Sequence, residues 1–214
     1  MPAFLISLAI FISDSVLHLI LQAHRKADGI DHWPIVLTKI VIVPSLYLTL
    51  FLGAEASGLD VHGAIWALSA CFFYTLGDIL LTQRWKTAFE LGALSFVLGH
   101  AAVSAGYMSR YFSPLLLFIA LAVYLFPLIR YLAAMRRGAG EGRAGYVFYG
   151  LVHYVFCALL ASSASPFAIA GSLLFAVSDC MIVYAITGAG RKRDVAVMAT
   201  YILSNILLAL GFLF

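Results

Sequence analysis

Charged residues are scarce in this sequence: Asp, Glu, Lys and Arg together make up 11% of its 214 residues, against about 25% in an ordinary soluble domain. A soluble fold of this size needs polar side chains to cover its outer surface, and this chain has too few of them. The shortage excludes a soluble globular enzyme, a disordered chain and a nucleic-acid-binding protein. A hydrophobic content of 64% and a mean hydropathy of +1.02 instead indicate an integral membrane protein.

Cysteine is scarce as well. The three cysteines, Cys71, Cys157 and Cys180, lie in apolar segments and lack the paired spacing of a disulfide framework or a zinc motif. We interpret them as small packing residues. We expect neither a metal nor another cofactor.

Long apolar runs are what the sequence does contain. A hydrocarbon core about 30 Å thick requires about 20 apolar residues per helix, and eight segments meet that length. They cover residues 2–24, 34–52, 62–83, 87–109, 113–135, 145–163, 166–187 and 194–213. The sequence therefore predicts an all-α fold, a polytopic helical bundle with eight transmembrane helices, in a single integral membrane domain over residues 1–214. The first segment lacks the basic start of a cleavable signal peptide, so we expect it to be retained.

Basic residues are distributed unevenly among the connections between these segments. The first, third, fifth and seventh connections hold Arg25, Lys26, Arg84, Lys86, Arg136, Arg137, Arg143, Arg191, Lys192 and Arg193. The even connections hold only Arg110. Because basic loops stay in the cytoplasm, we predict that the odd connections are cytoplasmic and that both termini lie on the opposite side. In a bacterial host the membrane would be the inner one.

Two similar segments raise the question of an internal duplication. WALSACFFYTLGDILL around Asp78 and FAIAGSLLFAVSDCMIV around Asp179 share small residues, an aromatic residue, an Asp and an apolar tail. They lie in the third and seventh predicted helices, so they would run parallel. A four-plus-four repeat is one interpretation. Chance recurrence of small residues in membrane helices is the other.

Ionisable side chains inside the apolar segments mark candidate functional positions, because each costs roughly 2.5–3.5 kcal/mol at the centre of a membrane helix. They include Asp14, His18, Lys39, Asp78, Glu90, His100, His153 and Asp179, and Asn205 is a neutral amide of the same kind. At about 1.5 Å of rise per residue, the aspartates fall at a similar depth, in the half of the bilayer nearer the odd connections. A single polar pocket would require such a shared depth.

Asp78 and Asp179 are the strongest candidates for catalysis. Each follows a small residue, in TLGD and in AVSD. Two carboxyl groups that share a dry site do not both ionise readily, so one stays protonated near neutral pH. Such a pair supplies a general acid and a general base. The alternative for each is a structural partner of a Lys or of backbone groups.

The other polar residues have a functional and a structural interpretation each. Asp14 and His18 are four residues apart and share a helix face, so they form either a proton relay or a self-satisfying pair. Lys39 binds a phosphate, neutralises a carboxylate or snorkels to the surface. His100 and His153 are hydrogen-bonded packing residues unless they line the pocket.

The order of these motifs resembles the YhhN family of eight-span membrane proteins, which includes lysoplasmalogenases. TLGDILL, FVLGH and AVSD carry the resemblance in the third, fourth and seventh predicted helices. Lys39, Tyr201 and Asn205 also match positions where the family tends to carry Lys and a Tyr with an amide. Two departures affect the pocket: Asn205 stands where Gln is commoner, and residues 101–103 are small where an aromatic residue is commoner.

The resemblance implies an ether hydrolase that cleaves the vinyl ether bond of lysoplasmalogens. Water would convert the alkenyl glycerophosphoethanolamine or glycerophosphocholine to a fatty aldehyde and the glycerophospho-head group. Asp78 and Asp179 would be catalytic. Residues that bind substrate or support the catalytic pair would be Lys39, Asp14, His18, His100, Tyr201 and Asn205. The expected partners are a lysophospholipid and the lipid bilayer; neither the head group nor an oligomeric state follows from the sequence.

Two other functions stay open. A zinc-dependent membrane lipid hydrolase would draw its ligands from His18, His100, His153 and an Asp, although no two of these histidines have the spacing of a zinc motif on one helix. A proton-coupled transporter or lipid carrier would also use buried Asp, His and Lys. Measuring bound metal would distinguish the zinc-dependent hydrolase from the ether hydrolase. Release of free aldehyde in detergent would distinguish the ether hydrolase from a transporter or carrier.

Overall fold

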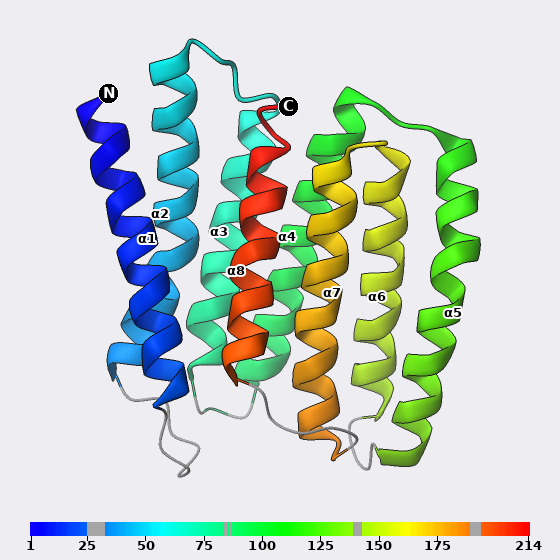
Figure 1. Ribbon diagram of the computed structural model, residues 1–214. Helices are drawn as coiled ribbons and strands as arrows, with labels where there is room; N and C mark the ends of the chain where they lie inside the picture. The colour runs from blue at the N-terminus through cyan, green and yellow to red at the C-terminus, as the bar shows by residue number, and fades with distance from the viewer. Residues whose placement is uncertain (25–32, 84, 86, 139–142, 189–193) are drawn as a thin grey trace. The chain divides into compact units, whose positions relative to one another are not determined.

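The computed structural model describes residues 1–24, 33–83, 85, 87–138, 143–188 and 194–214 of the chain, and none of these residues lies in a strand (Figure 1). The described residues form eight helices. They are α1 (Pro2–Ala23), α2 (Trp33–Ser57), α3 (Ala64–Leu81), α4 (Ala88–Arg110), α5 (Pro114–Gly138), α6 (Arg143–Ser162), α7 (Pro166–Ile186) and α8 (Asp194–Leu210). The predicted all-helical fold is confirmed.

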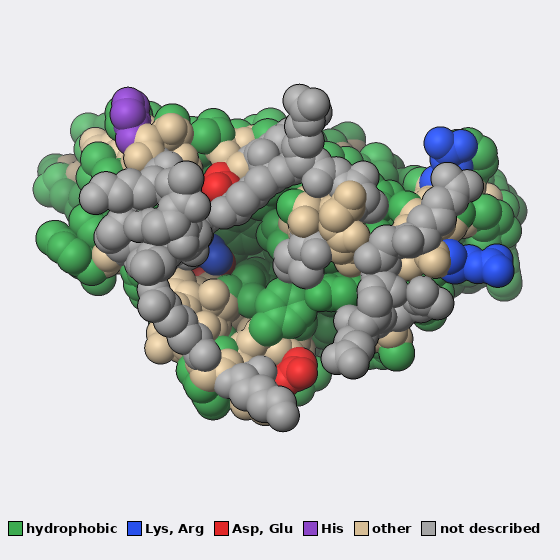
Figure 2. Space-filling model, turned by 90° about the horizontal axis from the view of Figure 1, so that it is seen from below, with side chains coloured by type: hydrophobic (Ala, Val, Ile, Leu, Met, Phe, Trp, Pro, Cys, Tyr) green, Lys and Arg blue, Asp and Glu red, His purple; other side chains and the backbone are tan. Residues whose placement is uncertain are grey.

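Seven of the helices in the described part of the chain are long and apolar enough to cross a membrane, and α8 is shorter, with 17 residues. Large apolar side chains lie on the outer surface, among them Phe118 and Phe126 on α5, which are 69% and 70% exposed. Figure 2 shows many hydrophobic side chains exposed on the surface. Exposed apolar side chains on long apolar helices are suited to lipid, so the chain is a multi-pass membrane protein.

The predicted helix ends lie within three residues of the observed ones, except at the end of α2. That helix was predicted to end at residue 52 and continues to Ser57. Ala54, Glu55 and Ala56 are good helix formers although the apolar run has ended. The helix stops where Gly58 takes a φ of +66°, which is the usual conformation of a glycine that follows a helix.

The chain divides into two compact units. Unit 1 comprises residues 1–106 and 209–214, and unit 2 comprises residues 107–208. The division falls near the boundary between α4 and α5, where a four-plus-four repeat would place it. The repeat and the single domain both stay predictions.

In unit 1, α4 packs on α3 through glycines spaced seven residues apart. They are Gly92, Gly99 and Gly106. A Cβ added at these positions would meet Leu81, Tyr74 and Trp66 of α3, in that order. Such close approach is typical of helices that meet through small residues. The small face of α4 therefore serves packing within the unit.

In unit 2, polar side chains tie neighbouring helices together through backbone carbonyls. The Tyr131 hydroxyl of α5 donates to the Tyr146 carbonyl of α6 at 2.8 Å, and the Ser178 hydroxyl of α7 donates to the Val197 carbonyl of α8 at 2.9 Å. The start of α7 is fixed by Ser165, whose side chain accepts from the Ala168 amide ahead of a proline at the first helical position. The first contact joins α5 to α6, and the second joins α7 to α8.

Candidate active site

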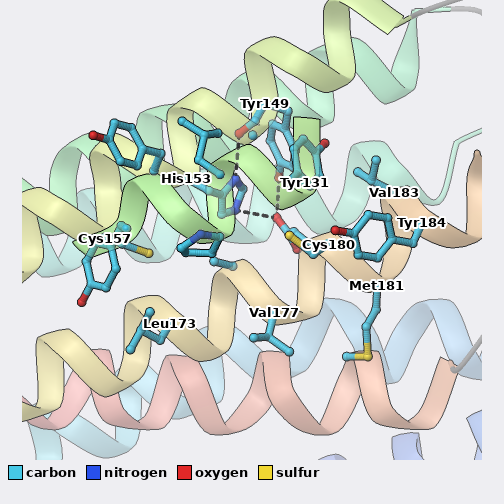
Figure 3. A pocket seen from close by; sticks show the side chains of 17 residues that line it. Tyr131, Tyr149, His153, Cys157, Leu173, Val177, Cys180, Met181, Val183 and Tyr184 are labelled. Carbon is cyan, nitrogen blue, oxygen red and sulfur yellow. Dashed lines mark hydrogen bonds and ion pairs between the residues drawn. The ribbon is translucent and has the colours of Figure 1, made fainter. Parts of the chain in front are cut away.

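Asp179 on α7 lies against two side chains of α6. The Tyr149 hydroxyl donates a hydrogen bond to Asp179 Oδ2 at 2.6 Å, and His153 Nε2 lies 3.0 Å from the same oxygen (Figure 3). Tyr149 and His153 are four residues apart and therefore share a face of α6. His153 and Asp179 are buried, so the three groups form a polar cluster inside an apolar unit.

A cavity of about 330 Å³ adjoins this cluster within unit 2. Its walls come from α5, α6 and α7 and are mostly apolar, with Leu173, Val177 and Tyr184 among the α7 side chains that line it (Figure 3). The volume lies at the lower end of the range of about 300–1,000 Å³ that is usual for small-molecule sites. Asp179 and His153 are part of the wall, so a molecule in the cavity would contact the polar cluster.

Asp78 on α3 is buried and forms an ion pair with the partly exposed Lys39 on α2. Lys39 Nζ lies 3.3 Å from Asp78 Oδ1, and the Asp78 side chain is 2% exposed. Of the interpretations of Lys39 given above, neutralisation of a carboxylate is the one that this contact provides. The ion pair also ties α2 to α3 in unit 1.

His18 on α1 binds α2 and not Asp14. Its Nδ1 lies 2.7 Å from Thr38 Oγ1, and Thr38 donates its own hydrogen to a backbone carbonyl one turn earlier on α2. Thr38 Oγ1 therefore accepts from Nδ1, and Nε2 accepts from the Gln22 amide at 3.3 Å. Both ring nitrogens are thus occupied. Asp14 Oδ2 is buried and forms no hydrogen bond with a described residue.

The remaining predicted residues lie in helix packing. In unit 1, His100 Nδ1 lies 2.9 Å from the Tyr74 hydroxyl, and both side chains are buried. In unit 2, the Asn205 amide donates to the Tyr201 carbonyl at 3.0 Å, and the Tyr201 ring packs edge-on against Phe175 at 5.4 Å. Tyr201 and Asn205 are not among the described residues that line the cavity.

The structure brings some of the predicted site residues together. Lys39 and Asp78 meet in unit 1, whereas Asp179 in unit 2 meets His153 and Tyr149. The sequence marks His153 as a candidate functional position, but His153 is not in the predicted catalytic and substrate-binding set, and Tyr149 is not predicted. Their four-residue spacing on one apolar segment is the signal that could have found them. The convergence of Asp78 with Asp179 stays a prediction.

Metal ligands do not gather among the described residues of either unit taken alone. Among the described residues of each unit taken alone, no three His, Cys, Asp or Glu side chains bring their ligand atoms together. In unit 2, His153 and Asp179 offer two ligands, fewer than the three or four of a zinc site. The zinc interpretation stays a prediction.

Most basic residues of the odd connections lie outside the described residues or have side chains outside them. They are Arg25, Lys26, Arg84, Lys86, Arg137, Arg143, Arg191, Lys192 and Arg193. Arg136 at the end of α5 is described and exposed.

The fold and the cluster define a class: a multi-pass membrane protein that holds a carboxyl group, an imidazole and a phenol at the wall of an apolar cavity. The family model of the YhhN family matches residues 34–212, which is most of the chain. The chain belongs to the YhhN family, so the resemblance seen in the sequence is confirmed, and membership is consistent with a membrane hydrolase. Comparison with curated proteins and with solved structures gives no match.

Proposed function

We propose that this protein is a membrane ether hydrolase that cleaves the vinyl ether bond of lysoplasmalogens. The observation that carries the proposal is the buried contact between Asp179 and His153 at the wall of an apolar cavity. A single-chain alkenyl lipid needs an apolar wall for its chain and a proton donor beside its vinyl ether. The cavity offers both, in a chain whose family includes lysoplasmalogenases.

The chemistry requires one proton to be given and one to be taken. A vinyl ether is stable to base and opens when a proton adds to the alkene carbon that does not carry the oxygen. The other alkene carbon then becomes an oxocarbenium ion. Water adds to this ion and loses a proton, and the resulting hemiacetal breaks down to the aldehyde and the glycerol hydroxyl. Glycoside hydrolysis by two carboxyl groups follows the same logic.

We assign the two roles to Asp179 and Asp78. Asp179 is suited to give the proton, because it shares a short contact with His153 at the cavity wall. Asp78, ion-paired with Lys39, is suited to be the anionic partner that stabilises the oxocarbenium ion and assists water. This assignment requires both carboxyl groups to act on one bound substrate.

The proposed substrate enters from the inner leaflet, with its chain along the apolar wall and its phosphate near Lys39 or near Arg84 and Lys86. In this arrangement the odd connections face the cytoplasm and both termini lie on the opposite side. The membrane is the inner membrane in a bacterial host.

The test uses purified, folded protein in detergent with alkenyl, alkyl and acyl lysolipids. We expect the wild type to release aldehyde from the alkenyl lipid and nothing from the saturated alkyl ether. Asp78→Asn and Asp179→Asn should each slow aldehyde release by about 100-fold or more, the factor typical of a general acid or base. Asp60→Asn, which changes an exposed acid between α2 and α3, is the matched control.

Three results would contradict parts of this proposal. Near-normal aldehyde release by either Asn variant would remove that carboxyl group from the pair. Release of fatty acid from the acyl lipid without aldehyde would replace the ether hydrolase by an esterase. Stoichiometric zinc, with activity lost to a chelator, would favour the zinc-dependent hydrolase, and binding of lipid without turnover would favour a carrier.

A further inference from the structure

We propose that His153 and Asp179 share one exchangeable proton. Tyr149 fixes the geometry of this pair, because its backbone carbonyl contacts His153 and its hydroxyl contacts Asp179. The catalytic consequence rests on the proposed function. The geometry rests only on contacts within unit 2.

The contact with Tyr149 fixes the tautomer of His153. His153 Nδ1 lies 3.0 Å from the Tyr149 carbonyl oxygen, and a carbonyl oxygen can only accept a hydrogen bond. Nδ1 therefore carries a hydrogen. In a neutral ring, Nε2 then presents a lone pair.

The Nε2 atom itself lies 3.0 Å from Asp179 Oδ2. Two acceptor atoms at such a distance repel each other unless one of them carries a proton. The His153–Asp179 pair therefore holds one proton in addition to the hydrogen on Nδ1, carried either by Nε2 or by Oδ2. This is the proton that the proposed reaction needs.

Tyr149 holds both members of the pair. Its backbone carbonyl orients His153 one turn later on α6, and its hydroxyl donates to Asp179 Oδ2 on α7 at 2.6 Å. The rings of Tyr149 and His153 also meet edge to face, with centroids 4.6 Å apart. A network fixed in this way does not need to reorganise when the proton moves.

The proton balance of the reaction follows from this arrangement. The shared proton passes from the pair to the alkene carbon, which leaves a neutral imidazole facing a carboxylate. Water then adds to the oxocarbenium ion and releases one proton to the carboxylate that assists it. Return of that proton to the His153–Asp179 pair restores the starting state, so no oxidant, reductant or co-reactant other than water is used.

The catalytic arm of the test compares kcat with KM for the alkenyl lysolipid. Gln at position 153 can still donate to Asp179 but does not exchange a proton, so we expect His153→Gln to lower kcat about 100-fold while KM stays nearly constant. Tyr149→Phe should lower kcat on the order of tenfold, the factor that a hydrogen bond to a charged group provides. A merely structural role would raise KM or lower the amount of folded protein instead.

Two control variants match these changes. His24 Nδ1 also contacts a carbonyl four residues earlier, that of Ile20 at 2.9 Å, but His24 is exposed at the end of α1. Tyr107 is buried and donates its hydroxyl to the Leu208 carbonyl at 2.8 Å, and it does not line the cavity. His24→Gln and Tyr107→Phe should leave kcat unchanged.

A second arm needs no turnover. In protein labelled with ¹⁵N-histidine, the His153 signals are identified by their loss in His153→Gln. We expect a protonated Nδ1 and an Nε2 signal that shifts when Asp179 is replaced by Asn. An Nε2 signal that does not respond to Asp179→Asn overturns the proton pair.

The two arms separate this inference from the proposed function. A wild type that releases no aldehyde contradicts the ether hydrolase, and the histidine signals then decide the pair by themselves. Aldehyde release by the wild type together with an undiminished kcat in His153→Gln contradicts the pair and leaves the ether hydrolase standing.

Discussion

At the scale of single residues, Asp78 and Asp179 differ in what neutralises them. Asp78 faces Lys39 at 3.3 Å, and Asp179 faces His153 at 3.0 Å. A lysine ammonium group can only donate hydrogen bonds, whereas a histidine ring nitrogen can donate or accept one. Two carboxyl groups with such different partners are suited to different chemical roles.

The Lys39–Asp78 ion pair leads to a prediction about stability. Lys39→Met leaves the buried Asp78 carboxylate without its cation, and removal of one partner of a buried pair costs about 3–5 kcal/mol. The double variant Lys39→Met with Asp78→Asn removes both charges and should recover much of this loss. Thermal unfolding in detergent measures both.

Lys39→Arg keeps the cation and serves as the control, with a melting temperature expected near that of the wild type. Equal melting temperatures for the single and the double variant would show that the ion pair does not govern stability at this position.

The residues of the candidate site could be predicted in part. Lys39, Asp78 and Asp179 were found because ionisable groups are rare in apolar segments. Tyr149 could not be found in this way, because tyrosine is common in membrane helices. The pair of Asp14 and His18 shows the limit of spacing: four residues place two side chains on one face, but His18 turns towards Thr38 on the neighbouring helix. Whether two such side chains touch depends on tertiary packing, and their spacing in the sequence does not determine that packing.

At the scale of helices, α3 and α4 alternate large and small residues across their interface. Gly99 on α4 faces the Tyr74 ring of α3, and Gly77 on α3 faces the Phe96 ring of α4. Each large ring therefore lies over a position with no side chain. The Tyr74 ring is fully buried and its hydroxyl reaches His100, so this interface also fixes the surroundings of His100.

This interface predicts a cost for added volume. In Gly99→Ala the new methyl group would collide with the Tyr74 ring, and overpacking of a buried interface typically costs about 1–3 kcal/mol. We expect a lower melting temperature in detergent. Gly145→Ala near the start of α6 is the control, because a Cβ there would meet nothing within 4 Å and alanine favours helix. A Gly99→Ala protein as stable as Gly145→Ala would contradict the interface.

The helices themselves could be predicted almost completely, because apolar length is a strong signal in a membrane protein. The end of α2 could not, because the prediction followed hydropathy to residue 52. The backbone instead follows helix propensity through Ala54, Glu55 and Ala56 to Gly58. Hydropathy predicts where the apolar part of the segment ends, whereas the helix itself continues to the residue before Gly58.

At the scale of the whole molecule, the orientation of the chain in the membrane is open to direct measurement. Asp60 lies between α2 and α3 and Gln83 lies just after α3, and both are exposed. With Cys71, Cys157 and Cys180 replaced by Ala, we expect Gln83→Cys to react with an impermeant maleimide from the cytoplasmic side and Asp60→Cys from the opposite side. The physical reason is the distribution of basic residues.

Reaction of both variants from the same side would contradict the span between these positions. Reaction from the sides opposite to those expected would reverse the predicted orientation while leaving the helices unchanged.

The cavity is the feature of the whole molecule that the sequence could not supply. Three helices contribute to its walls, and each contributes residues that would be ordinary lipid-facing or packing side chains if taken alone. The similar depth of the aspartates in the bilayer indicated that they could meet. It did not indicate which side chains lie next to each of them.

The backbone carbonyl of Tyr149 has a consequence for how such a protein can change over time. No substitution at position 149 removes that oxygen, so the orientation of the imidazole on the next turn is inherited by every side chain that keeps α6 helical. Only the phenol is open to replacement. Relatives that have lost the aromatic ring at this position should therefore still place the histidine Nε2 beside the aspartate on α7. They would lack only the hydrogen bond that the tyrosine hydroxyl donates to that aspartate.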